Sequence, residues 1–298
     1  MTISHDTPVM STSGAGLALW QVPASDTLPS FPAVVFYPSP VATGTTTVGP
    51  YTFAATRDAA VAPGRHPLCL ISHGGGGSHL LYRSIASHLA ERGWIVVCPE
   101  HPYDNRNDRS RVNTDEAARD RPRHLTHTID ALLAHETWGA HIDAGRIGVV
   151  GHSMGGFAAL AMGGGQPWSM TRVPLDTRAD DRISAAVLLA PAVGWFGAPG
   201  ALDGVRIPLL VMVGEHDPVT PAGQVREVLA ALPPAVPLTL DVVPGAGHFA
   251  FITPFPAEMR RPDFPPSVDP PGFDREAFHA TLPSRIARFL EDHVLSLR

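Results

Sequence analysis

The chain has 298 residues, of which 44% are hydrophobic and 17% are charged, a composition typical of one large domain over residues 1–298 with a well-buried core. All 22 basic residues are arginine, which excludes Schiff-base chemistry, a pyridoxal-binding lysine and a Walker phosphate loop. The net charge of −6 and the lack of a basic run argue against nucleic acid as a main partner.

The sequence carries no sign of export or of a membrane anchor. Residues 1–13 have neither a basic start nor an apolar stretch of signal-peptide length. No segment approaches the roughly 20 apolar residues that a membrane span needs. We therefore expect a soluble, cytoplasmic protein, and the sequence does not indicate its oligomeric state.

Short apolar runs alternate with helix-like stretches along the chain, which is the pattern of parallel strands joined by crossover helices. The runs predict strands over residues 33–37, 68–72, 94–98, 146–150, 185–189, 209–213 and 238–243, and helices over residues 79–92, 124–135, 153–162, 222–231 and 275–295. We therefore expect an α/β fold with a mostly parallel central sheet of about eight strands flanked by helices.

Two segments interrupt this alternation. Residues 102–123 are polar and rich in charge, and residues 253–273 carry prolines throughout, so neither is expected to form a regular core element. Ligands bind beyond the carboxyl ends of the strands in a sheet of this kind, and both segments leave from that edge or close to it. They are candidate lid-forming loops.

A glycine-rich turn, His73-Gly74-Gly75-Gly76-Gly77-Ser78, follows the predicted strand over residues 68–72. Its backbone can approach a ligand because no side chains intervene, which is what an oxyanion hole requires. A phosphate loop is the competing interpretation. It lacks a following lysine, and His79 stands where the last glycine of G-x-G-x-x-G would be.

The sequence Gly151-His152-Ser153-Met154-Gly155 directly follows the predicted strand over residues 146–150 and precedes a predicted helix. A serine on a sharp strand-to-helix turn needs very small neighbours two residues to either side, and glycine occupies both places. This pattern predicts a nucleophile elbow with Ser153 as the nucleophile, although an ordinary tight turn would also fit the five residues alone. The candidate oxyanion donors are the backbone N–H of Met154 and that of Gly75 or Gly76.

A carboxylate follows the predicted strand over residues 209–213. Asp217 is the candidate acid of a triad, which would accept a hydrogen bond from a histidine and hold its tautomer. A helix N-cap or turn aspartate is the alternative. The rivals are Glu215, which is nearer the strand, and Asp241, which is inside the next one.

A histidine follows the predicted strand over residues 238–243, after the sequence Pro244-Gly245-Ala246-Gly247. Glycines on the approach allow the loop to fold His248 over the serine, so His248 is the candidate general base. His152 and His216 are interpreted as neighbours of the site.

The sequence gives little indication of a metal site or of a disulfide. His135 and His141 are six residues apart, and neither H-E-x-x-H nor C-x-x-C occurs, so no metal or other cofactor is expected. Cys69 and Cys98 each lie in an apolar run, which favours reduced core residues over a disulfide.

The order Ser153, Asp217, His248, with His73-Gly74 after an early strand, resembles the α/β-hydrolase superfamily over residues 30–298. Further stretches are similar to bacterial dienelactone hydrolase-like proteins related to platelet-activating-factor acetylhydrolases. These stretches are Val48-Gly49-Pro50-Tyr51, Leu70-Ile71-Ser72-His73-Gly74, Pro99-Glu100-His101-Pro102, Arg123 with Asp130-Ala131-Leu132-Leu133, and Ala246-Gly247-His248-Phe249. The resemblance implies the α/β-hydrolase fold and a nucleophile–acid–histidine triad.

Two departures from related families bear on the substrate. Dienelactone hydrolases carry a cysteine nucleophile where this chain has Ser153, which argues against dienelactone itself. The Gly-His-Ser-Met-Gly-Gly elbow is also similar to that of cutinase-like polyester hydrolases, but those place an aromatic residue in the first oxyanion loop, where this chain has Gly75.

The expected function is that of a metal-independent serine esterase acting on a small-molecule ester with a short or small apolar acyl group. Candidate pocket residues are Gly76, His152, Trp195, Phe196 and Phe249, with core packing an equal alternative for each aromatic. An acyltransferase or cofactor-free perhydrolase would use the same triad with another acceptor. A non-hydrolysing ligand receptor on the same fold is the alternative from another class.

Overall fold

The structure is a computed structural model that describes residues 14–296, so the prediction made from residues 1–13 lies outside the described residues. No helix within the described part of the chain is long and apolar enough to cross a membrane.

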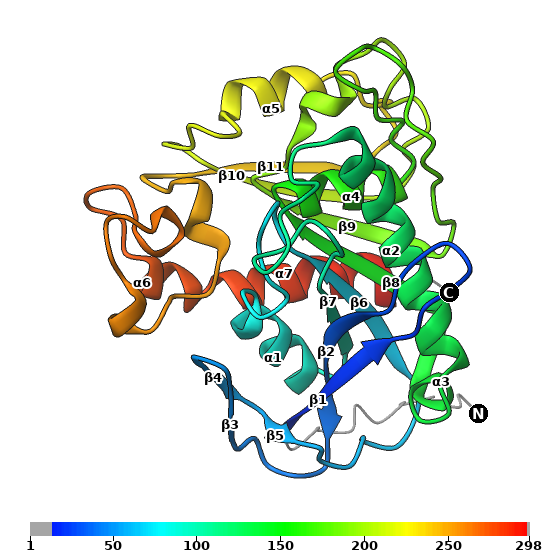
Figure 1. Cartoon of the computed structure of the whole chain (residues 1–298), viewed down its shortest axis with the longest axis vertical. Coiled ribbons are helices and arrows are strands. Elements are labelled where there is room, and N and C mark those ends of the chain that lie inside the picture. The colour runs from blue at the N-terminus through cyan, green and yellow to red at the C-terminus, as the bar shows by residue number, and fades with distance from the viewer. Residues whose placement is uncertain (1–13, 297–298) are drawn as a thin grey trace, which may run out of the picture.

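A nine-stranded sheet forms the centre of the molecule, in the order β11-β10-β9-β8-β6-β7-β2-β1-β5 (Figure 1). The strands are β1 Gly14–Val22, β2 Phe31–Ser39, β5 Thr56–Arg57, β6 His66–Ser72, β7 Ile95–Pro99, β8 Ile142–His152, β9 Ile183–Leu189, β10 Leu209–Gly214 and β11 Leu238–Val243, with a separate hairpin of β3 Thr45–Val48 and β4 Tyr51–Ala54. The run from β11 to β7 is entirely parallel, and β2 pairs antiparallel with both β7 and β1. The expectation of a mostly parallel sheet flanked by helices is confirmed.

Helices cover both faces of this sheet. They are α1 Arg83–Glu91, α2 Asp115–Ala134, α3 Trp138–His141, α4 Met154–Met162, α5 Ala222–Leu229, α6 Arg275–His279 and α7 Leu282–Leu290, with short turns η1 Val193–Phe196, η2 His248–Phe251, η3 Ala257–Met259, η4 Pro265–Ser267 and η5 Glu291–Leu295. Helices α2, α4 and α5 pack into one apolar cluster, and α1 and α7 into another.

The strands of the core supply side chains to both clusters. In β8, for example, Val149 belongs to the cluster of α2 and α4, whereas Val150 belongs to the cluster of α1 and α7. Successive side chains of a strand point to opposite faces, and a strand covered on both sides is therefore apolar throughout. This explains why the central strands could be predicted as continuous apolar runs.

In the N-terminal part of the sheet, the prediction over residues 33–37 identified β2, but β1 and β5 were not predicted. Strand β1 pairs with β2 along its whole length, from Gly14 opposite Ser39 to Val22 opposite Phe31. Its small residues give a weak strand signal, so its formation depends on the partner strand. The hairpin of β3 and β4 is also absent from the prediction.

The expectation that residues 102–123 lack a regular element is wrong from Asp115 onward. Helix α2 begins there, and the side chain of Thr114 accepts a hydrogen bond from the Ala117 N–H at 3.2 Å, as an N-cap does. The Thr-Asp-Glu sequence is a helix start signal, but Pro122 and the surrounding charged residues made the segment resemble a loop. Residues 275–295 likewise form separate elements, because α6 ends at His279 and a new helix, α7, begins at Leu282 with Pro283 in its first turn.

The prolines of residues 253–273 do keep this segment irregular. It contains only the short turns η3 and η4 and projects beyond the sheet beside α6, in orange in Figure 1. Because β6, β8, β10 and β11 are parallel, the loops that follow them leave from one edge of the sheet.

Candidate active site

Ser153 lies on a strained turn between β8 and α4. Its backbone has φ 54° and ψ −116°, a conformation that L-residues rarely adopt. The turn is held on both sides, because the Ser153 N–H donates to the Leu189 carbonyl at 2.9 Å and the Ser153 carbonyl accepts from the Phe157 N–H at 3.0 Å. The geometry is that of a nucleophile elbow.

The two glycines that flank the serine are required by the close approach of the backbone. A Cβ atom on Gly151 would clash with the Gly155 carbonyl, and one on Gly155 would clash with the Ser72 carbonyl of β6. The G-x-S-x-G spacing therefore follows from the packing of β8 against α4 and β6.

His248 and Asp217 are hydrogen-bonded to each other. The His248 Nδ1 and Asp217 Oδ2 atoms are 2.8 Å apart, and both side chains are buried. The Asp217 Oδ1 atom accepts from the N–H groups of Val219 and Thr220, each at 2.8 Å, and its Oδ2 atom accepts from the Thr220 hydroxyl at 2.8 Å. The turn aspartate and the candidate triad acid are thus the same residue.

These contacts determine the ionisation of Asp217. Burial alone would raise the pKa of the carboxyl group, but the hydrogen bond and charge of His248, with the Thr220 bonds, outweigh it and hold the pKa below its usual value. The carboxylate therefore accepts the His248 Nδ1–H. The side-chain bonds of His248 all involve Nδ1, so Nε2 is free of protein partners within residues 14–296.

Ser153 and His248 border one cavity of about 640 Å³. Its polar side carries Gly74, Gly75, Gly76 and Met154, and the loop residues Arg106, Arg109 and Asn113. Its apolar side is built by Phe249, Ile252, Phe255, Met259, Phe264, Pro265 and Pro266, with Tyr51 from the unpredicted hairpin. We call the first group, together with Ser153 and His248, the polar wall, and the second group the apolar wall.

The predicted pocket residues divide in two. Gly76, His152 and Phe249 border the cavity, whereas Trp195 and Phe196 do not. This corrects the prediction for those two aromatics: their rings pack on Phe157 of α4, with ring centroids 5.6 and 5.4 Å away. An aromatic after a strand can fill the core as readily as a pocket, and nothing in the local sequence separates the two.

Among the four glycines of the glycine loop, Gly74 to Gly77, one amide lacks an acceptor within the described residues. The Gly74 N–H donates to the Tyr82 hydroxyl at 3.4 Å, the Gly76 N–H to Asp104 Oδ1 at 2.8 Å, and the Gly77 N–H to the Gly74 carbonyl at 3.0 Å. The Gly75 N–H has no acceptor within the described part of the chain. A Cβ on Gly75 would lie 3.5 Å from Met154 Cγ, so this amide lies beside the start of α4.

His152 is a buried neighbour that orients the site. Its Nε2–H donates to the His248 carbonyl at 2.9 Å, so its Nδ1 accepts from the Tyr82 hydroxyl at 2.9 Å. Burial lowers the pKa of His152 to about 3, which keeps the ring neutral. These hydrogen bonds connect the Gly74 N–H, through Tyr82 and His152, to the backbone of His248.

Further histidines lie buried behind the glycine loop. The His73 Nδ1–H donates to the Gly74 carbonyl at 2.7 Å, and the His73 Nε2 accepts from the His101 N–H at 3.0 Å. His101 Nδ1 lies 3.2 Å from His124 Nδ1. Within residues 14–296, no group of three or more potential ligands is arranged to hold a metal ion.

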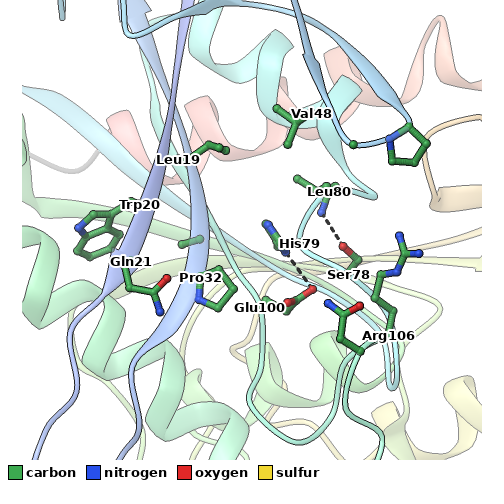
Figure 2. A pocket seen from close by; sticks show the side chains of 14 residues that line it. Leu19, Trp20, Gln21, Pro32, Val48, Ser78, His79, Leu80, Glu100 and Arg106 are labelled. Atoms are coloured by element: carbon green, nitrogen blue, oxygen red, sulfur yellow. Dashed lines mark hydrogen bonds and ion pairs between the residues drawn. The ribbon is translucent and has the colours of Figure 1, made fainter.

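A second cavity of about 510 Å³ lies beside the first and shares Ser78 and Arg106 with it. Figure 2 shows its lining, with the pair of His79 Nδ1 and Glu100 Oε1, 3.1 Å apart, between Leu80 and Pro32. None of the residues that line this cavity was predicted as a site residue, because its walls come from β1, β2 and the β3–β4 hairpin as well as the glycine loop.

Three comparisons with known proteins bear on this geometry. A family model described as alpha/beta hydrolase fold matches residues 67–205, which contain the glycine loop and the elbow. A search among curated proteins found no match. A solved structure, "Ferulic acid esterase from Streptomyces cinnamoneus", has a TM-score of 0.74 at 20% identity and is aligned over 98% of this chain and 93% of its own. Together with the sheet order and the elbow, these findings establish that the chain has the α/β-hydrolase fold.

Proposed function

We propose that this protein is a serine hydrolase that cleaves carboxylic esters through an acyl-enzyme intermediate. One observation carries the proposal: the hydrogen-bonded pair of Asp217 and His248 borders the cavity to which the strained elbow presents Ser153. A nucleophile, a base and a group that orients the base are the parts that acyl transfer requires.

The first half of the reaction forms the acyl-enzyme. His248 Nε2 takes the proton of the Ser153 hydroxyl as the oxygen attacks the ester carbonyl, and Asp217 stabilises the resulting imidazolium. The Ser153–His248 contact has to close when substrate binds, since within residues 14–296 the His248 ring is bonded only through Nδ1. The oxyanion is held by the Met154 and Gly75 N–H groups. The intermediate then collapses, and His248 returns the proton to the departing alcohol.

The second half repeats these steps with water. His248 removes a proton from the water, whose oxygen attacks the acyl carbon, and the same amides hold the second oxyanion. Collapse breaks the bond to Ser153 Oγ, which regains its proton from His248. Each proton that His248 takes is returned, so the reaction needs no cofactor.

The apolar wall favours a substrate ester whose acyl group is small and apolar or aromatic. Phe249, Phe255 and Phe264 border the same cavity as Ser153. The structural neighbour is called a ferulic acid esterase, and an aromatic acid of that kind would suit such a wall. The sequence resemblance to dienelactone hydrolase-like and platelet-activating-factor acetylhydrolase-like proteins is compatible with the same class of small esters.

We propose that residues 253–273 form a lid over the cavity, within a single domain. This segment supplies five residues of the apolar wall: Phe255, Met259, Phe264, Pro265 and Pro266. Residues 102–123 are a weaker candidate, because Asp104 and Arg121 within them are fully buried.

A fluorophosphonate probe tests the proposal. We expect the probe to label Ser153, identified by mass spectrometry of the peptide that contains it, because only an activated serine reacts quickly. Ser153→Ala should not be labelled. Turnover of a series of aryl esters of increasing acyl length would then define the acyl preference. Adding alcohol or peroxide as a competing acceptor would reveal acyl transfer in place of hydrolysis.

An unlabelled Ser153 in the folded protein, together with no turnover of any ester in the series, would contradict the proposal. It would favour a ligand receptor on the same fold.

A further inference from the structure

A fully buried ion pair lies behind the glycine loop and has no part in the steps above. Arg121 Nε donates to Asp104 Oδ2 at 2.7 Å, and the two side chains are 0% and 1% exposed. Arg121 is in α2 and Asp104 is in the loop before it. A buried ion pair often gives no more stability than an apolar pair of the same size, so stability alone does not account for charges at this place.

Both partners also bond the backbone of the glycine loop. Arg121 Nη1 donates to the His73 carbonyl at 2.5 Å, and Nη2 donates to the Gly74 carbonyl at 3.2 Å. Asp104 Oδ1 accepts the Gly76 N–H at 2.8 Å. The guanidinium fork and the carboxylate therefore hold the loop at three residues, Gly74 and Gly76 on either side of Gly75 and His73 before them.

The orientation of the Gly75 N–H follows from these bonds. The Gly74 carbonyl belongs to the same peptide unit as the Gly75 N–H, and in a planar trans peptide the two groups point in opposite directions. The Gly74 carbonyl is directed to Arg121 and also accepts from His73 Nδ1 and the Gly77 N–H. The Gly75 N–H is consequently turned away from Arg121.

The same bonds exclude the neighbouring amide as an oxyanion donor. The Gly76 N–H is engaged by Asp104, whereas the Gly75 N–H has no acceptor within residues 14–296, and Gly75 borders the cavity with Ser153 and Met154. A charged donor on the Gly74 carbonyl also polarises the peptide and strengthens its N–H as a donor.

We propose that Arg121 and Asp104 are positioning residues for ester hydrolysis: they fix the Gly74–Gly75 peptide so that the Gly75 N–H, and not that of Gly76, is the second oxyanion donor beside Met154. The inference rests on the proposed function of the site. It assigns Arg121 and Asp104 to the second half of the oxyanion hole, which neither residue touches directly.

The Arg121→Lys substitution tests this role with the charge retained. A lysine can pair with Asp104 but cannot hold the His73 and Gly74 carbonyls in the fixed geometry of the guanidinium fork. We expect kcat to fall by about 10²-fold, as loss of one oxyanion donor does, with KM changed by less than about threefold. The affinity for an alkyl boronic acid, whose tetrahedral adduct places an oxygen in the hole, should fall in parallel with kcat/KM.

The matched control is Arg182→Lys, in a half-buried ion pair with Asp180 that does not border the cavity. It should leave kcat, KM and boronate affinity unchanged, while the thermal midpoint reports any general loss of stability for both variants. A folded Arg121→Lys with kcat within about threefold of the parent, or with its loss confined to KM, would overturn the proposal. Fluorophosphonate labelling separates the outcomes, since an unlabelled parent protein would instead overturn the proposed function.

Two further measurements keep the test decisive if Arg121→Lys does not fold. Asp104→Asn has the same shape and can still accept from Gly76, and we expect kcat to fall by about tenfold through loss of the charge that holds Arg121. In the unmodified protein, adding the boronic acid should shift the Gly75 amide proton resonance downfield and leave that of Gly76 in place. A shift at Gly76 with none at Gly75 would refute the assignment.

Discussion

The two walls of the cavity are held by the same device and present different chemistry. Behind the polar wall, Arg121 donates to the Asp104 carboxylate and to three backbone carbonyls, those of His73, Gly74 and Asp104. Behind the apolar wall, Arg275 donates to Asp269 at 2.7 Å and to the carbonyls of Pro266 and Val268 at 2.8 and 3.0 Å. The Arg121 clamp, formed with Asp104, fixes backbone amides of the glycine loop. The Arg275 clamp, formed with Asp269, fixes a loop that presents side chains to the cavity. Catalysis and recognition are thus built on separate supports.

The supports also differ in how tightly they are held. The carboxylate of Asp104 is 1% exposed, whereas that of Asp269 is 19% exposed. The polar wall continues directly from β6 and β8 in the centre of the sheet, while the apolar wall lies on a proline-rich segment with only short turns. Changes on the polar wall should therefore act on kcat, and changes on the apolar wall on KM.

Removal of the proposed nucleophile gives the largest expected effect and tests whether the polar wall carries the chemistry. Ser153→Ala should lower kcat on an aryl ester by about 10⁵- to 10⁶-fold, with KM nearly unchanged, because the covalent path is lost. Steady-state kinetics on protein purified free of other esterases measures this. Turnover close to that of the parent would show that another group is the nucleophile.

Acid should destabilise the polar wall more than the apolar wall. Burial holds the pKa of His73 and His101 well below the usual value and lowers that of His124 and His152 to about 3, whereas behind the apolar wall it lowers the pKa of His279 to about 4. These rings stay neutral in the folded protein, but in the unfolded chain they take up protons near pH 6.5. The unfolded state therefore binds more protons between about pH 6.5 and pH 3, and stability is lost as the pH falls through this window.

Each such histidine contributes at most about 1.4 kcal/mol per pH unit, so we expect unfolding to begin between about pH 6 and pH 4. Urea titrations from pH 8 to pH 5 measure the free energy of unfolding along this range. His124→Gln should reduce the slope by up to one proton. An unfolding free energy that is the same at pH 7.5 and pH 5 would be incompatible with neutral buried histidines.

The candidate triad and the glycine positions of the polar wall could be predicted from the sequence, whereas Arg106, Arg109 and Asn113 of the same wall could not. The reason is geometric. Ser153, Asp217 and His248 each come after an apolar strand, and the carboxyl ends of parallel strands lie together at one edge of the sheet. The glycine spacing around the elbow is demanded by backbone contacts, so it is visible as a local pattern. These signals lie within a few residues of the side chain they concern.

The supports could not be predicted, because burial of a charge is decided by distant partners. Arg121 lies among Arg119, Asp120 and Arg123, and its local sequence does not distinguish it from these charged neighbours. Of the four, only Arg121 is fully buried, and it pairs with Asp104, 17 positions away. The apolar wall has the same difficulty. Prolines mark residues 253–273 as irregular without indicating which of the aromatics face the cavity.

A change in the apolar clamp should affect recognition alone. Arg275→Lys keeps the charge near Asp269 but loses the fork that holds the Pro266 and Val268 carbonyls, which loosens the loop carrying Phe264 and Pro265. We expect KM for an aryl ester to rise by about three- to tenfold and kcat to stay within about twofold. Kinetics beside Arg121→Lys make the comparison direct. A fall in kcat like that of Arg121→Lys would mean that the walls are not independent.

The smallest expected effect concerns how firmly the polar wall holds its acid. The Thr220 hydroxyl lies 2.8 Å from Asp217 Oδ2 and 3.1 Å from the Ala190 carbonyl, and its single proton can serve only one of them at a time. Thr220→Val keeps the shape and removes the hydroxyl. Asp217 then retains the Val219 and Thr220 amides, since residue 220 still has its N–H, and the His248 Nδ1–H.

One net hydrogen bond is worth about 1 kcal/mol, so kcat should fall by about fivefold with KM unchanged. Asp217→Asn, which reverses the polarity of the bond to His248, should cost about 10⁴-fold and sets the scale for the comparison. If Thr220→Val approached that larger loss, the hydroxyl rather than the two amides would be the group that orients Asp217. A loss of only a few-fold would mean that the amides of the turn already hold the carboxylate in place, as the backbone clamp does for the Gly75 N–H.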